Sequence, residues 1–121
     1  MGLEFKVDVQ LDANKIEKKV NSLFDETLML QIHSLFERYC DPYVPYLHGP
    51  LSRTTDVTAE RVRYTQPYAH YQYVGEDFNH TLEVHPKATA YWDKVMMSEM
   101  GEQFCDEVYE LIHRRAKELY G

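Results

Sequence analysis

The fold is decided first by residues 3–11, which read Leu3-Glu4-Phe5-Lys6-Val7-Asp8-Val9-Gln10-Leu11. Apolar and polar side chains alternate along the whole stretch. A period of two predicts a β-strand with one buried and one exposed face. Such a strand needs neighbouring strands and a layer that covers its apolar face, so we expect a sheet packed against helices.

A first helical pattern follows this strand. Asp12 is a suitable N-cap for a helix that begins after it. Within the same pattern, Ser22 is expected to cap a new helix, whose first turn contains Asp25 and Glu26. Pro42 and Pro45 are expected to end the helix. Apolar side chains recur in this region at three- and four-residue steps and predict one buried helical face: Ile16, Val20, Leu23, Phe24, Leu28, Ile32, Leu35, Phe36 and Tyr39.

A second helical pattern occupies the C-terminal part of the chain. We expect Pro86 in its first turn and a kink at Gly101. Its apolar face comprises Tyr91, Trp92, Val95, Met96, Met100, Phe104, Val108, Leu111, Ile112, Ala116 and Leu119.

The middle of the chain predicts more strands. Thr54–Val57 and Arg61–Thr65 are expected to form a hairpin around Thr58-Ala59-Glu60. The stretch Tyr68–Gly75 is expected to be an edge strand in which Tyr71 and Tyr73 share one face. We therefore predict an α+β fold of one domain over residues 1–121. A small antiparallel sheet, made of the N-terminal strand, the central hairpin and the edge strand, packs against a long N-terminal helix and a C-terminal helix.

Net charge, apolar content and cysteine content limit the classes of protein to which this chain can belong. A formal net charge of −7 argues against a nucleic-acid binder, which needs a basic surface. The N-terminus lacks a signal-peptide core, and no stretch has the apolar length of a membrane span. Cys40 and Cys105 are expected to be reduced, buried apolar residues. The candidates for a local basic strip are Arg61, Arg63, Arg114, Arg115 and Lys117.

Catalytic chemistry has one candidate. Histidines and carboxylates are concentrated between His70 and His85, and a metal-dependent hydrolase or nuclease would use His70, His80, Glu83 and His85. Their spacing matches no helical metal-binding motif. There is also no nucleophile elbow, phosphate loop or dinucleotide fingerprint. We therefore expect no enzyme activity and no cofactor, with the hydrolase or nuclease kept as an alternative.

Tyrosine is the most unusual feature of the composition. Of ten tyrosines, seven lie between Tyr39 and Tyr73. Tyrosine combines a large contact area with a polar tip and little rotamer entropy, which suits contacts between proteins. The alternative explanation is ordinary packing in strands and core. The residues that we expect to contact a partner are Tyr43, Tyr46, Leu51, Tyr68, Tyr71, Tyr73 and Phe78.

Several of these residues belong to a familiar order of motifs. Tyr43-Val44-Pro45 precedes Gly49 and Leu51, and is followed by Pro67-Tyr68-Ala69-His70-Tyr71-Gln72-Tyr73-Val74-Gly75, by His85-Pro86-Lys87-Ala88 and by Trp92. This order resembles the minor capsid proteins of siphophages and prophages of Gram-positive bacteria, within the wider group of head–tail connector and tail-completion proteins. Relatives commonly have Thr-Gly-x-Leu-Arg after Tyr-Val-Pro, whereas this chain reads His48-Gly49-Pro50-Leu51-Ser52-Arg53.

The resemblance implies a structural virion component without catalytic residues. It implies copies arranged as a ring in the neck, in contact with portal, tail or other neck proteins, and present in the bacterial cytoplasm before assembly. Neither a membrane nor a specific nucleic-acid sequence is expected as a partner. The isolated protein is expected to be a monomer or weak oligomer. A host or prophage protein-binding module remains the other alternative.

Overall fold

The computed structural model describes residues 3–9, 23–44, 55–65, 69–74 and 89–121, with the side chains of residues 70–72 left out. Along the chain the elements are β1 (Leu3–Phe5), α2 (Glu26–Cys40), the 3₁₀ helix η2 (Asp41–Tyr43), β2 (Thr55–Val57), β3 (Val62–Tyr64), α3 (Ala69–Val74) and α4 (Trp92–Tyr120). The predicted α+β class is confirmed: a three-stranded antiparallel sheet packs against two long helices.

The sheet has the order β1-β3-β2, with Leu3 and Thr55 both opposite Tyr64. The predicted hairpin is confirmed. The turn of the hairpin contains no glycine or asparagine and is stabilised by Thr58. The Thr58 hydroxyl accepts hydrogen bonds from the backbone N–H groups of Glu60 and Arg61 at 3.2 Å each. A polar side chain therefore holds the turn that joins β2 to β3.

β1 is shorter than predicted. The ladder ends at Phe5, although exposure continues to alternate as far as Val9. The reason is that β3 offers only three residues for pairing. Beyond the ladder, the N–H of Val7 donates instead to the side chain of His33 on α2, at 3.1 Å.

α2 begins one residue after Asp25, whose side chain accepts a hydrogen bond from the backbone N–H of Leu28 at 2.9 Å. The prediction that Ser22 caps this helix with Asp25 inside its first turn is wrong, because Asp25 is the N-cap. The helix expected to start at Asp12 lies outside the described residues. At the other end α2 stops at Cys40, and Pro42 lies in the 3₁₀ turn that follows, as expected.

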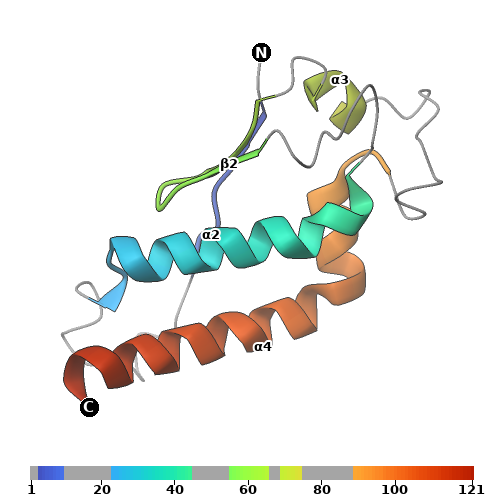
Figure 1. The fold of residues 1–121 in the computed structure, drawn as a ribbon. Coiled ribbons are helices and arrows are strands. Elements are labelled where there is room, and N and C mark those ends of the chain that lie inside the picture. Colours follow the sequence, from blue (N-terminus) through green and yellow to red (C-terminus); the bar gives the residue numbers. More distant parts are fainter. Residues whose placement is uncertain (1–2, 10–22, 45–54, 66–68, 75–88) are drawn as a thin grey trace.

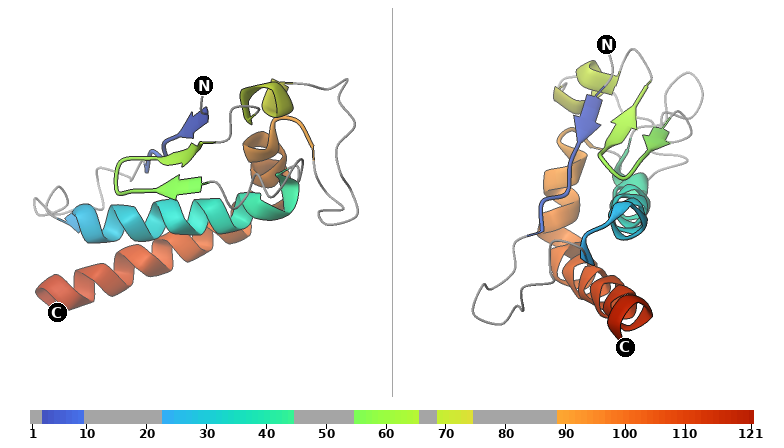
Figure 2. Two further views of the ribbon diagram at one scale, coloured as in Figure 1. Left: turned by 45° about the horizontal axis from the view of Figure 1, so that its top comes forward. Right: turned by 90° about the vertical axis from the view of Figure 1, so that its left-hand side faces the viewer.

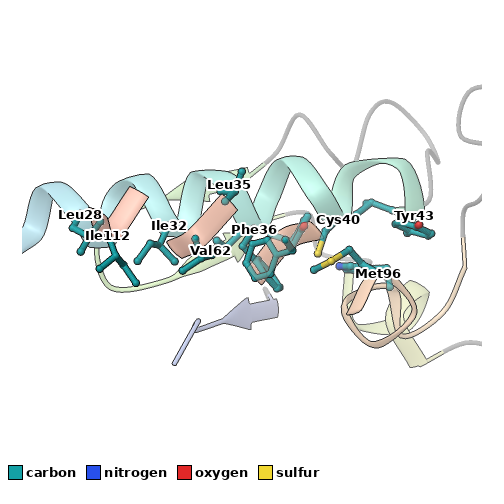
Figure 3. Packing of buried hydrophobic residues seen from close by; sticks show 14 of the residues in the cluster. Leu28, Ile32, Leu35, Phe36, Cys40, Tyr43, Val62, Met96 and Ile112 are labelled. Atoms are coloured by element: carbon teal, nitrogen blue, oxygen red, sulfur yellow. The ribbon is translucent and has the colours of Figure 1, made fainter. Parts of the chain in front are cut away.

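α2 is the middle layer of the molecule. Figures 1 and 2 show the sheet on one side of it and the long C-terminal part of α4 on another, running in the opposite direction. In Figure 3 side chains of α2 meet Val62 of the sheet and Met96 and Ile112 of α4. The fully buried large side chains are Trp92, Tyr43, Tyr64, Leu28, Ile32, Met96, His33, Val44, Val62 and Cys40.

α4 starts later than predicted. Tyr91 precedes it in the left-handed region, with φ 49°, so the backbone turns there and helical geometry begins at Trp92. Pro86, predicted for the first turn, lies outside the described residues. Figure 1 shows that α4 bends between its first turns and its long C-terminal part. Gly101 is buried within this helix, and its role as the point of bending stays a prediction.

The edge strand predicted at Tyr68–Gly75 is wrong, because residues 69–74 form the short helix α3. Positions two apart in a helix point about 200° away from each other, so the shared strand face predicted for positions 71 and 73 is wrong as well. Ala69 is fully buried, and Tyr73 packs against the core cluster. Packing has thus overridden the strand propensity of tyrosine and valine.

Candidate interaction surface

An aromatic cluster fills the core beside α3. The ring of Tyr73 lies 5.0 Å from that of Trp92, 5.1 Å from that of Tyr91 and 5.5 Å from that of Phe5, all edge to face. The ring of Tyr64 lies 5.3 Å from that of Trp92 in the same geometry. Edge-to-face contacts of this kind stabilise a core beyond the area that they bury. The cluster joins β1, β3, α3 and the start of α4.

Hydrogen bonds reinforce the same junction. The Tyr73 hydroxyl donates to the Asp93 carboxylate at 2.5 Å, and the Tyr73 carbonyl accepts from the N–H of Tyr91 at 2.8 Å. Burial raises the pKa of Tyr73, and the Asp93 carboxylate raises it further. Tyr73 therefore stays protonated and acts as a donor that fixes α3 to α4.

The predicted contact residues fall into three groups. Tyr43 is 2% exposed, and Tyr73 is half-buried in the aromatic cluster. Tyr71 lies on α3, where only the backbone is described. The others lie outside the described residues: Tyr46, Leu51, Tyr68 and Phe78. Their contact with a partner stays a prediction, and for Tyr43 and Tyr73 the structure adds a role in packing.

The structure gives no geometry for the alternative metal site. His80, Glu83 and His85 lie outside the described residues, and the side chain of His70 is not described. Within the part of the chain that the structure describes, no three His, Cys, Asp or Glu side chains converge as metal ligands would.

Cys40 and Cys105 differ in solvent exposure. Cys40 is fully buried, as expected, and burial raises the pKa of its thiol, which disfavours the thiolate that a nucleophile needs. Cys105 was expected to be buried and is exposed on α4. The expectation failed because Cys105 lies beside the apolar face of α4 and not on it.

Most of the candidate basic residues are engaged in ion pairs. The Arg61 guanidinium contacts the Glu4 carboxylate at 3.1 Å, and Arg63 approaches the same carboxylate at 3.9 Å across the strands. Arg115 of α4 bonds the N-cap Asp25 of α2 at 2.5 Å, and this interaction is the main cause of the lowered pKa of Asp25. These arginines join elements of the fold and do not form a separate basic strip.

The outer side of α4 is the surface that the sequence patterns did not single out. Tyr109 is 50% exposed and Met97 43% exposed; among the large apolar side chains of the described residues, only Tyr120, at 48%, has a value between them. Both border a mainly apolar groove of about 360 Å³ between α4 and the segment that follows β1. The available signal was the position of Tyr109 one residue after the buried Val108, which turns it away from the core.

These observations define a small α+β module, and among its described residues no group of His, Cys, Asp or Glu side chains is assembled as metal ligands. The sequence model of one family, described as minor capsid protein, matches residues 6–106, so the chain belongs to the minor capsid protein family. No curated protein and no solved structure gave a match.

Family membership gives the chain a structural role as a component of a phage virion, where it contacts other virion proteins. It does not support the alternative of a metal-dependent hydrolase or nuclease, and it does not support that of a host or prophage protein-binding module. None of the described helices combines the length and apolar character that crossing a bilayer requires.

Proposed function

We propose that this minor capsid protein acts in head–tail joining, as a non-enzymatic component of the phage neck or connector. Its copies form a ring through contacts between unlike surfaces, and the ring contacts portal, tail or other neck proteins. Before assembly the protein resides in the bacterial cytoplasm as a single domain over residues 1–121.

The observation that carries the proposal is the family match over residues 6–106, together with the resemblance of the Tyr68–Gly75 and His85–Trp92 strings to minor capsid proteins, which resemble the wider group of head–tail connector proteins. Contacts between unlike surfaces close into rings when the rotation between subunits permits it. A net charge of −7 suits a subunit beside a DNA passage, because like charge prevents adhesion of the DNA.

A deletion of the gene in an inducible phage tests the proposal. Electron microscopy of the lysate should find DNA-filled heads and complete tails that are not joined. Purified protein added to that lysate should restore joined particles and infectivity. Wild-type protein supplied from a plasmid is the control for effects on neighbouring genes.

Two results would overturn head–tail joining. Joined, infectious particles without the protein would exclude an essential role in the neck. Empty or misshapen heads would place its action in capsid assembly instead. Ring formation has its own readout, which is cryo-electron microscopy of the necks of joined particles.

A further inference from the structure

One face of α4 carries an ordered set of exposed residues. Glu102, Asp106, Tyr109, His113 and Lys117 follow one another at steps of four, three, four and four residues, which places all five on one side of a helix. We call this set the α4 outer stripe. All five side chains are exposed, whereas Phe104, Val108 and Ile112 point from the opposite side of α4 into the core.

The charges of the α4 outer stripe are arranged in order. Two carboxylates, Glu102 and Asp106, precede Tyr109, and an imidazole and an ammonium group, His113 and Lys117, follow it. Among the described residues none of the four titratable groups forms an ion pair, in contrast to Arg61 and Arg115. The sign of the charge therefore reverses about Tyr109.

This reversal selects one kind of partner. A helix with the same sequence, turned end for end, presents its ammonium and imidazole groups to the carboxylates of the first copy, and its carboxylates to the ammonium and imidazole groups of that copy. Because both signs lie on the same face, the contact is the same from either side, as a two-fold interface requires. The exposed ring of Tyr109 lies at the centre, where a large aromatic residue contributes most to a contact.

We propose that the free protein forms a weak two-fold dimer through antiparallel pairing of the α4 outer stripes. Glu102 of one copy lies opposite Lys117 of the partner subunit, and Asp106 lies opposite His113 of the partner subunit. Tyr109 contacts its counterpart on the axis. One helix face buries little area, and two copies of charge −7 repel each other, so the dimer forms only at high protein concentration.

This dimer is distinct from the proposed ring. A two-fold contact pairs two copies and stops, whereas a ring in the neck needs contacts between unlike surfaces. The dimer is therefore a state of the unassembled protein. The dimer is tested with the purified chain alone. A negative result there leaves the proposed function in place, and failure of the proposed function leaves the dimer in place.

Charge exchange tests the pairing. Lys117→Glu and Glu102→Lys should each weaken the dimer about ten-fold, because each substitution sets like charges against each other at two symmetric positions. The double exchange in one chain should restore it, and so should a mixture of the two single variants. Arg114→Glu is the matched control: it makes the same change in net charge at an exposed position of α4 outside the α4 outer stripe. Sedimentation over a wide concentration range gives the dissociation constants.

Disulfide trapping tests the geometry. With Cys105 replaced by serine, Tyr109→Cys should cross-link two copies under mild oxidation, since position 109 lies on the axis. Arg114→Cys in the same background should not. The proposal is overturned by a protein that stays monomeric at all concentrations, by a dimer insensitive to the charge exchanges, or by an Arg114→Glu effect equal to that of Lys117→Glu. Circular dichroism of each variant confirms that it is folded.

Discussion

His33 is the buried polar side chain on which the position of the N-terminal strand depends. It is 1% exposed, and its Nε2 accepts the N–H of Val7 at 3.1 Å, 26 residues away along the chain. Because Nε2 accepts, the neutral ring carries its proton on Nδ1. Burial lowers the pKa of His33, against an opposing effect of the backbone of Met29 and Ala59.

Replacing His33 by asparagine should destabilise the protein by about 1–2 kcal/mol, because the shorter side chain cannot reach the N–H of Val7 and leaves that donor without a partner. Glutamine is the matched control. Its amide oxygen reaches the position of Nε2 and can accept the same hydrogen bond, so His33→Gln should cost clearly less.

Acid should have a related effect on the wild-type protein. The unfolded chain binds a proton at His33 near the ordinary pKa of 6.5, while the folded chain resists it because its pKa is lower. Below pH 6.5 the unfolded state therefore binds more protons, and stability falls with pH until the folded-state pKa is reached. The limiting slope for one such group is about 1.4 kcal/mol per pH unit.

Urea unfolding of wild-type and His33→Gln protein, at several pH values between 7.5 and 5, measures both effects. The other five histidines are present in both proteins, so the difference between the two curves isolates His33. The wild-type curve should fall more steeply below pH 6.5. Parallel curves, or equal losses for the asparagine and glutamine variants, would refute the role of this hydrogen bond.

Three further predictions concern other parts of the fold. Asp25→Ala should lower the urea midpoint more than Asp25→Asn, which can still cap α2; equal midpoints would contradict the capping role. Tyr73→Phe should cost about 1 kcal/mol in urea unfolding, because the hydroxyl that donates to Asp93 is lost; an unchanged midpoint would show that this bond contributes nothing. A thiol reagent should modify Cys105 in the native protein and Cys40 only after unfolding, and rapid reaction of both thiols would contradict the burial of Cys40.

The regular elements with simple periodicity were predictable from sequence. The alternation that begins at Leu3, the hairpin around Thr58 and the apolar face of α4 each follow from local spacing, and all three are present. α3 was not predictable in this way. Its six residues contain β-favouring tyrosine and valine, whereas the contacts that Tyr73 makes in the helix are with Phe5 and Trp92, which lie far away in the sequence.

Interaction surfaces were harder to predict than elements. Exposure on α4 depends on which side faces α2, and the apolar spacing alone did not separate Cys105 from its buried neighbours. The pairing of Arg115 with Asp25 joins residues 90 positions apart, and no local pattern announces it. Local structure was therefore largely predictable from the sequence, whereas the charged side chains that stay free of ion pairs within the fold were not.

Tyrosine content illustrates the difference between the two kinds of inference. The excess between Tyr39 and Tyr73 suggested a contact surface, yet Tyr43 and Tyr64 are buried and Tyr73 joins the aromatic cluster. A small core gains from tyrosine, because the ring packs edge to face while the hydroxyl can reach a carboxylate such as that of Asp93. The string that resembles minor capsid proteins therefore marks in part how this chain folds. A contact surface has to be sought among exposed residues, and within the described part of the chain the most exposed large aromatic side chain is Tyr109 on α4, where the charge pattern reverses.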